Sequence, residues 1–187
     1  YGGGAIYCAS GPSAPLIDHN VISYNQAMSN NAGAVYLDGG AEATLTHNMI
    51  TYNTAEAYAG GVMCSSVGPS TEIAFNQITN NTASMGGGMA CITEVEAFIH
   101  DNLIANNASM NGGAMYIKFG SSPLIENNTI VNNHADGHGG GFFVSVASEP
   151  VLHNCIVYGN EAAGDGAQLF LEDEDSDPDL RFCDLMG

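Results

Sequence analysis

A repeat of 25 to 29 residues runs through the whole chain and constrains its fold more than any other feature. The second position of a Gly-Gly pair, or of a close variant of it, falls at residues 4, 33, 61, 88, 113, 141 and 167. A second motif, Asn-x-Ile-x-x-Asn, keeps the same spacing. It begins at Asn20, Asn48, Asn76, Asn102 and Asn128, and Cys155 and Cys183 begin two further copies. Internal repeats of this length indicate a solenoid, a propeller or a similar array.

The apolar runs within each repeat are short, alternate with other residues and end at Gly, Asn or Pro. Helical repeats of about 33 to 47 residues need long stretches of 3.6-residue periodicity, and leucine-rich repeats need regularly spaced Leu; neither pattern is present. Short strands separated by turns once per repeat fit the coils of a solenoid. We therefore predict that residues 1–187 form one all-β domain, a single-stranded, right-handed parallel β-helix of about seven coils.

In such a β-helix, equivalent residues of successive coils stack about 4.8 Å apart. One predicted interior column contains Ile17, Leu45, Ile73, Ile99, Ile125, Leu152 and Leu180. A second contains Ile22, Ile50, Ile78, Ile104, Ile130, Val157 and Leu185. A third, at a tight interior corner, contains Ala27, Ala55, Ala83, Ser109, Ala135 and Ala162. Between them we expect an internal ladder of Asn20, Asn48, Asn76, Asn102 and Asn128, continued by Cys155 and Cys183, because stacked amides satisfy one another's hydrogen bonds.

Alternation along the strand after each Gly-Gly pair predicts an inward and an outward face. We expect Ile6, Cys8, Val35, Leu37, Met115, Ile117, Leu169 and Leu171 to point inward. We expect the outward face to carry Ala5, Tyr7, Ala34, Tyr36, Val62, Cys64, Met89, Cys91, Ala114, Tyr116, Phe142, Val144, Gln168 and Phe170. An exposed apolar strip of this length usually contacts a partner. The predicted binding residues are therefore Tyr7, Tyr36, Tyr116 and Phe170.

The charge of the chain excludes several classes of partner. Twenty acidic residues face two basic ones, Lys118 and Arg181, for a formal net charge of −18. No basic face can form, so we expect neither nucleic acid nor an anionic membrane as a partner. No run of about 18 apolar residues is present, so we expect no transmembrane segment. Since the chain opens at Tyr1 without an export leader, we interpret it as a segment or the mature form of a longer exported chain.

Two tetrapeptides carry a family resemblance. Gly3-Gly4-Ala5-Ile6, and Ile-x-x-Asn as in Ile50-Thr51-Tyr52-Asn53, resemble the Gly-Gly-Ala-Ile and Phe-x-x-Asn motifs of bacterial surface or secreted right-handed parallel β-helix repeat proteins, including polymorphic outer-membrane proteins. Ile replaces the aromatic residue throughout, and residues 154–184 are similar to the last coils of secreted β-helix proteins. The resemblance implies the scaffold and a secreted or outer-cell-surface location. It implies no particular activity, because this scaffold hosts many.

The alternative function is a polysaccharide-processing enzyme, either a lyase or a glycosidase. A lyase would need a base beside a calcium site, and neither basic side chain has an identifiable carboxylate cluster near it. A glycosidase needs two carboxyl groups about 5 to 9 Å apart. Asp18 and Glu126 share an outward column but lie four coils, or about 19 Å, apart. Asp101 with Glu126 and His100 could still meet near one turn, although a solvated polar edge is the simpler interpretation.

Two groups of side chains are candidates for binding cations. His19 and His47 stack on adjacent coils, and His134 and His138 share a turn with Asp136, but no zinc-site spacing is present and we interpret them as turn residues. The run from Glu172 to Asp179 places alternating carboxylates in one turn, which can wrap a hard cation. Calcium is therefore the one cofactor considered, with a hydrated acidic loop as the alternative. Its ligands would be Asp173, Asp175, Asp177 and Asp179.

The five cysteines permit vertical crosslinks. Cys64 and Cys91 occupy one place on consecutive coils, Cys155 and Cys183 occupy another, and Cys8 is left over. Neighbouring coils bring Cα atoms within disulfide range, although directly stacked Cβ atoms lie slightly too far apart. Disulfides, which export would permit, and a stack of small apolar side chains both fit this pattern.

These observations favour a non-enzymatic extracellular or cell-surface module with a structural or adhesive role and no catalytic residues. Its partner would be another copy of the chain, associating end to end or laterally, or a glycan or protein on a surface. The alternatives are the polysaccharide-processing enzyme and a spacer without a binding role.

Overall fold

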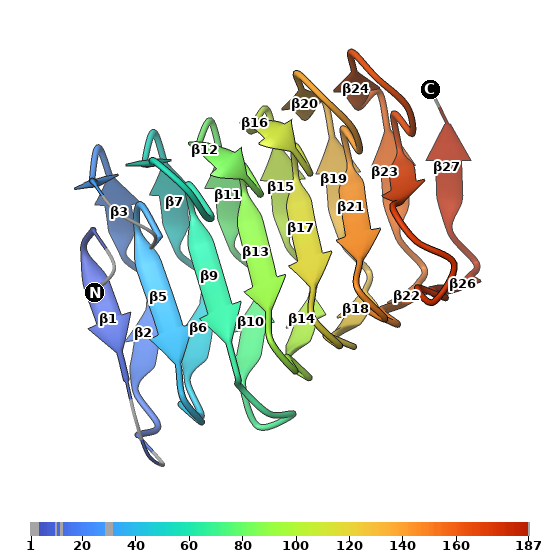
Figure 1. The fold of residues 1–187 in the computed structure, drawn as a ribbon. Helices are drawn as coiled ribbons and strands as arrows, with labels where there is room; N and C mark the ends of the chain where they lie inside the picture. The colour runs from blue at the N-terminus through green and yellow to red at the C-terminus, as the bar shows by residue number, and fades with distance from the viewer. Residues whose placement is uncertain (1–3, 10, 12, 29–31, 187) are drawn as a thin grey trace.

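A computed structural model describes residues 4–9, 11, 13–28 and 32–186 of the chain. These residues form a parallel β-solenoid of about seven coils, built from short strands that stack into four sheets along its length (Figure 1). Three sheets contain seven strands and the fourth contains six. The predicted all-β, parallel solenoid is confirmed.

Each coil contributes one strand to each sheet in turn. The first sheet contains β1 (Ile6–Cys8), β5 (Val35–Asp38), β9 (Val62–Ser65), β13 (Met89–Ile92), β17 (Met115–Lys118), β21 (Phe142–Ser145) and β25 (Leu169–Leu171). The second contains β2 (Leu16–Asp18), β6 (Thr44–Thr46), β10 (Glu72–Ala74), β14 (Phe98–His100), β18 (Leu124–Glu126), β22 (Val151–His153) and β26 (Asp179–Arg181). The third contains β3 (Val21–Ser23), β7 (Met49–Thr51), β11 (Gln77–Thr79), β15 (Leu103–Ala105), β19 (Thr129–Val131), β23 (Ile156–Tyr158) and β27 (Asp184–Met186). The fourth contains β4 (Gln26–Ala27), β8 (Thr54–Ala55), β12 (Thr82–Met85), β16 (Ala108–Asn111), β20 (His134–Ala135) and β24 (Glu161–Ala162).

The two predicted aliphatic columns form the core. The strand register pairs Ile17 with Leu45 and Leu45 with Ile73, and it stacks Ile22, Ile50 and Ile78 in the same way. Both columns belong to one continuous buried cluster as far as Leu152 and Val157, and in the last coil Leu185 is exposed. The third predicted column is buried from Ala27 to Ala135 and half-buried at Ala162, and Ala27, Ala55 and Ala83 form a small cluster separate from this core.

The structure corrects the predicted faces of the first sheet. In its third, fourth and sixth strands the register lies one residue earlier than the Gly-Gly alignment predicted, so that Val62 pairs with Val35 and Met89. The residues that consequently point into the core, and not outward as predicted, are Val62, Cys64, Met89, Cys91, Phe142 and Val144. Ala34 and Ala114 are buried in the core as well.

A column of glycines explains this register. Gly33, Gly60, Gly87, Gly113 and Gly140 stack on one another, and a Cβ on any of the first four would overlap the backbone oxygen of the next glycine. The position that must be glycine is thus the second of the Gly-Gly pair in some coils and the first in others. A one-residue change in register moves every side chain of a strand to the opposite face.

The outward column of the first sheet is apolar, as predicted, but most of it is covered. It contains Tyr7, Tyr36, Met63, Ala90, Tyr116, Phe143 and Phe170. Tyr58, Ala59 and Met85, which precede the first-sheet strands of their coils, pack over it and form a second hydrophobic cluster outside the main core. Tyr116 is only 2% exposed, and the expectation of an exposed apolar strip is therefore wrong.

Candidate functional site

Two ladders of asparagine side chains hold the turns on either side of the third sheet. The first runs through Asn20, Asn48, Asn76, Asn102 and Asn128, and the second through Asn25, Asn53, Asn81, Asn107, Asn133 and Asn160. In both, Nδ2 donates to Oδ1 of the Asn in the next coil over 2.8–3.1 Å. The backbone N–H of each residue donates to the same oxygen. Buried amides are thereby satisfied, and the turns are fixed.

The first ladder was predicted, and the structure confirms it together with its continuation by cysteine. The Cys155 Sγ donates to backbone carbonyls of Ile125 and His153, and Cys183 makes the equivalent contacts one coil later. The second ladder was not predicted, although its residues are the second Asn of the repeated motif. That repetition was the signal that could have revealed it.

The turn beside the first ladder projects a row of rings into solvent. His19, His47 and Phe75 each precede a ladder Asn, and each has a left-handed backbone with φ between 54° and 57°. Their rings stack from coil to coil: the centroids of His19 and His47 are 4.6 Å apart, and those of His47 and Phe75 are 5.2 Å apart. The interplanar angle is 13° in both pairs. The shared turn conformation thus aligns side chains that lie 28 residues apart in the sequence.

A second row of rings borders the opposite end of the same strands. Tyr24 and Tyr52 precede residues of the second ladder, have φ values of 58° and 56°, and stack with centroids 5.2 Å apart. Both are exposed, and Tyr24 has 78% of its surface in solvent. Between the two rows lie the outward side chains of β3, β7 and β11, including exposed Val21 and Met49.

We call this surface the aromatic face. It consists of His19, His47, Phe75, Tyr24 and Tyr52 together with Val21, Met49 and Gln77 between the two rows. A shallow hollow of about 390 Å³ lies beside the histidine row, over Val21, Met49 and Gln77. The face combines exposed apolar surface with polar ring edges and an amide. It occupies the first three coils, because Asp101 and Asn80 follow in the two rows and end the runs of rings.

An ionised carboxylate lies at one edge of the aromatic face. The Asp18 Oδ2 is 2.7 Å from His19 Nδ1, and Asp18 Oδ1 is 3.2 Å from His47 Nδ1. The Thr46 hydroxyl donates to the same Oδ1 over 2.8 Å. Hydrogen bonds from His19 and Thr46 lower the pKa of the Asp18 carboxyl below its usual value. Asp18 is therefore charged at neutral pH, with two imidazoles beside it.

The candidate glycosidase residues are not joined in one cluster. His100 binds two carboxylates, with Nε2 3.0 Å from Glu72 and Nδ1 2.8 Å from Asp101. Glu126 instead lies 3.2 Å from Nδ1 of His153, one coil further along. The column itself has the predicted order, since His100 pairs with Glu126 in the strand register. The side chains of Asp101 and Glu126 nevertheless bind different histidines.

The four predicted binding residues do not share one exposed surface. Tyr7 is exposed and donates its hydroxyl to Asp38 over 3.2 Å. Tyr36 and Tyr116 are buried, and the Tyr116 hydroxyl accepts a hydrogen bond from Lys118 Nζ over 3.2 Å. Phe170 packs partly buried against Phe143. Burial raises the pKa of Tyr116, which keeps its hydroxyl neutral.

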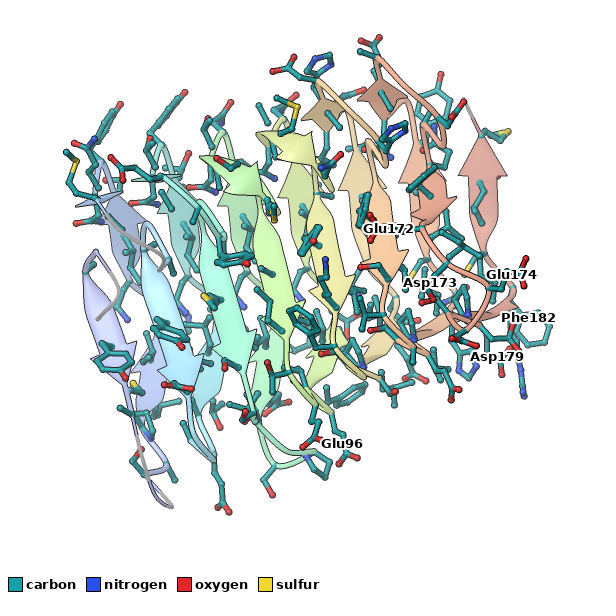
Figure 2. The ribbon with its side chains drawn as sticks, in the orientation of Figure 1. Glu96, Glu172, Asp173, Glu174, Asp179 and Phe182 are labelled. Atoms are coloured by element: carbon teal, nitrogen blue, oxygen red, sulfur yellow. The ribbon has the colours of Figure 1, made fainter. Side chains whose placement is uncertain are left out.

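The acidic run from Glu172 to Asp179 follows β25 and leads into β26 in the last coil, where Figure 2 labels Glu172, Asp173, Glu174 and Asp179. Asp173 accepts hydrogen bonds from the Val146 N–H and the Ser176 hydroxyl, and Asp179 pairs with Arg181. These contacts lower the pKa values of both carboxyls. The structure does not bring Asp173, Asp175, Asp177 and Asp179 together as a set of cation ligands. Within the described ranges, the one group of three ligating side chains with donor atoms within 4.8 Å of one another is Asp18, His19 and His47.

All five cysteines are free thiols in the structure. Cys64 and Cys91 are adjacent, as predicted, but they lie in the core, where a hydrogen bond between them and their burial raise the pKa of Cys91 well above its usual value. Burial raises the pKa of Cys155 to about 11. Of the two interpretations of these pairs, the structure shows the stack of small apolar side chains.

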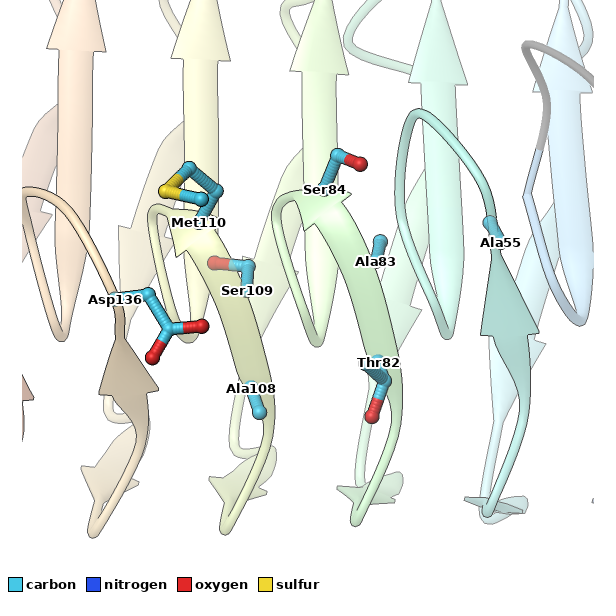
Figure 3. A pocket seen from close by; sticks show the side chains of 8 residues that line it. All are labelled: Ala55, Thr82, Ala83, Ser84, Ala108, Ser109, Met110 and Asp136. Atoms are coloured by element: carbon cyan, nitrogen blue, oxygen red, sulfur yellow. The ribbon is translucent and has the colours of Figure 1, made fainter.

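A second hollow lies over the fourth sheet, between β8, β12, β16 and β20 (Figure 3). Its volume is about 320 Å³, and small residues such as Ala83, Ala108 and Ser109 leave the space open. Asp136 is its one charged side chain and Met110 its one large apolar one. It therefore offers a ligand fewer distinct contacts than the aromatic face does.

The stacked strands and the two amide ladders define a parallel β-solenoid. The family model described as "right handed beta helix region" matches residues 66–176, which is more than half of the 187-residue chain. The chain belongs to this right-handed β-helix family. No curated protein and no solved structure matches it. The described residues include no helix of the length and apolar character that a membrane crossing requires.

Proposed function

We propose that this protein is a non-enzymatic adhesion module of the extracellular space or cell surface, and that it binds neutral carbohydrate through the aromatic face. The observation that carries the proposal is the pair of exposed ring rows, His19–His47–Phe75 and Tyr24–Tyr52, on either side of the same strands. Exposed apolar surfaces with polar edges are typical of sites that contact a partner.

The chemistry of the face suits a sugar. A pyranose has apolar C–H faces and a rim of hydroxyls. Val21 and Met49 offer apolar contact, while tyrosine hydroxyls, imidazole nitrogens and the Gln77 amide offer hydrogen bonds to hydroxyls. The ladders and stacked rings hold these groups in place before binding, which lowers the conformational entropy lost on binding. The net charge of −18 disfavours polyanionic glycans.

The test is binding of the purified chain to a panel of soluble polysaccharides by affinity electrophoresis and calorimetry. The panel contains neutral β-glucan, mannan and galactan, with pectate and alginate as acidic counterparts. We expect retention by at least one neutral polymer and by neither acidic one. The double variant Tyr24→Ser/Tyr52→Ser should weaken this binding by about tenfold or more, since loss of aromatic contacts of about 1 kcal/mol each accumulates.

Tyr158→Ser provides the matched control, because Tyr158 is an exposed tyrosine on β23 of the same sheet, four coils from Tyr52. Its binding should equal that of the unmodified chain. Equal loss in both variants, preference for the acidic polymers, or release of reducing ends during incubation would each contradict the proposal. Self-association in place of glycan binding would appear as concentration-dependent sedimentation and would also contradict it.

A further inference from the structure

We propose that Asp18, His19 and His47 form a transition-metal site and that Zn²⁺ is the ion best matched to it. The three side chains come from the end of β2 and from the left-handed turn positions that precede β3 and β7. Their donor atoms, one carboxylate oxygen and two imidazole nitrogens, lie within 4.8 Å of one another. Mixed nitrogen and oxygen ligands of this kind suit Zn²⁺, whereas Ca²⁺ and Mg²⁺ require oxygen ligands.

The carboxylate is already oriented for this role. Asp18 lies between His19 Nδ1, at 2.7 Å, and His47 Nδ1, at 3.2 Å, and the Thr46 hydroxyl holds it from a third direction. Without metal, the two Nδ1–H groups donate to the carboxylate. A bound ion replaces these two protons, and each imidazole then carries its proton on Nε2.

The histidines can make the small adjustment that shared coordination requires. The rings now stack nearly parallel, so they must tilt to direct both nitrogens at one ion. The side chain of His19 is 70% exposed and that of His47 is 48% exposed, so no packed core opposes this rotation. Three protein ligands leave a fourth position open. His19 and His47 also line the hollow of the aromatic face.

Two other places where a histidine lies beside two carboxylates differ in a way that excludes the same coordination. His100 uses Nε2 for Glu72 and Nδ1 for Asp101, and His134 directs Nε2 to Asp136 and Nδ1 to Glu161. In both cases one imidazole bridges two carboxylates on opposite edges of its ring, so the three groups cannot surround one ion. At Asp18, by contrast, two imidazoles meet one carboxylate. The strongly negative chain also raises the local concentration of divalent cations.

The test is calorimetric titration of the chelator-treated chain with Zn²⁺ at pH 7.5 in the presence of excess Mg²⁺. We expect one Zn²⁺ per chain, and we expect His19→Ala, His47→Ala and Asp18→Asn each to weaken binding by at least about tenfold. His134→Ala removes another exposed histidine with two carboxylate neighbours and should leave the affinity unchanged. Circular dichroism checks that each variant keeps the fold. Titration with Co²⁺ should give visible absorption bands, which report coordination by nitrogen and oxygen.

Stoichiometric Zn²⁺ binding that survives in a His19→Ala/His47→Ala double variant would overturn the proposal. So would a loss in His134→Ala equal to that in His19→Ala, or complete competition by Mg²⁺. His19 and His47 belong to both proposed sites, but Tyr24 and Tyr52 are not metal ligands, so the Tyr24→Ser/Tyr52→Ser variant should retain its Zn²⁺. A chain that binds no polysaccharide can therefore still confirm the zinc site, and a chain that binds no Zn²⁺ can still confirm the carbohydrate site.

Discussion

At the scale of single residues, the ladder asparagines from the second coil onward combine burial with hydrogen bonding. Asn81 is fully buried; its Nδ2 donates to the Ile50 carbonyl over 2.9 Å and to Asn107 Oδ1 over 3.1 Å. Its own Oδ1 accepts both the backbone N–H and the Nδ2 of Asn53. Each such side chain therefore links its own coil by hydrogen bonds to the coils before and after it.

Replacing Asn81 by Ala should lower the free energy of unfolding by about 2 to 4 kcal/mol. The substitution leaves the buried backbone N–H of Asn53 without its acceptor and removes the Asn81 side-chain hydrogen bonds with Asn53 Nδ2, Ile50 O and Asn107 Oδ1. An unsatisfied buried group costs about 1 to 3 kcal/mol, and each further lost hydrogen bond costs about 1 kcal/mol. Urea unfolding followed by circular dichroism measures the change. Gln77→Ala, at the exposed first residue of β11, should change stability by less than about 0.5 kcal/mol. Similar values for both variants would show that the ladder does not stabilise the coils.

At the scale of strands, prediction succeeded where the repeated residue had one possible environment. The Ile22 and Ile50 column could be assigned because an aliphatic residue in every coil fits the interior alone, and Asn48 could be assigned because a repeated amide needs a repeated partner. The faces of the first sheet could not be assigned with equal certainty. Gly-Gly in one coil and Gly-Ala in another can be aligned in two ways, and the contacts that decide between them involve backbone atoms of the next coil.

The candidate sites were likewise predictable where they depend on repeated positions and unpredictable where they depend on turns. Stacking of His19 on His47 was predicted from their spacing, but the Asp18 carboxylate between them depends on side-chain directions at a turn. The cover over Tyr116 comes from residues such as Tyr58, in the turn after β8, and Met85, the last residue of β12, where the connection to the first sheet varies in length between coils. No column of like residues marks such turns, so the burial of the outward tyrosines could not be predicted from periodicity.

Gly87→Ala tests the glycine column at this scale. An added Cβ would lie 2.5 Å from the Gly113 oxygen and 2.6 Å from the Ala108 oxygen, both of them backbone atoms. The coils would have to separate locally, and we expect a loss of about 3 kcal/mol or more, or failure to fold. Gly68→Ala is the control, because an added Cβ there meets nothing within 4 Å. Thermal unfolding of the two variants gives the comparison, and equal midpoints would contradict the proposed role of the column.

At the scale of the whole molecule, the net charge of −18 opposes the compact state, and solution conditions can change this effect. Only two basic residues oppose twenty acidic ones; Arg181 pairs with Asp179, and Lys118 lies 3.9 Å from Glu172. Repulsion among the remaining carboxylates opposes the compact state and is screened by salt. We therefore expect higher ionic strength to stabilise the folded chain.

Raising NaCl from 10 to 500 mM at pH 7 should increase the thermal unfolding midpoint by several degrees. Screening weakens repulsion in the folded state more than in the expanded unfolded chain. Differential scanning calorimetry across a salt series measures the shift, with uncharged sucrose at matched osmolality as a control for solvent effects. A midpoint that falls as salt is added would mean that local ion pairs, and not repulsion, dominate the electrostatics.

The amide ladders also bear on how such a chain can lengthen. Successive asparagines of the second ladder are separated by 28, 28, 26, 26 and 27 positions along the sequence, yet every link is the same Nδ2 to Oδ1 hydrogen bond. Because the turns away from the ladders absorb these differences, duplication or deletion of an entire coil in the gene would join one Asn to another and leave every bond equivalent. Loss of one codon between the two Asn residues of a coil would interrupt both rows. Growth by whole units is thus the change that this architecture tolerates best.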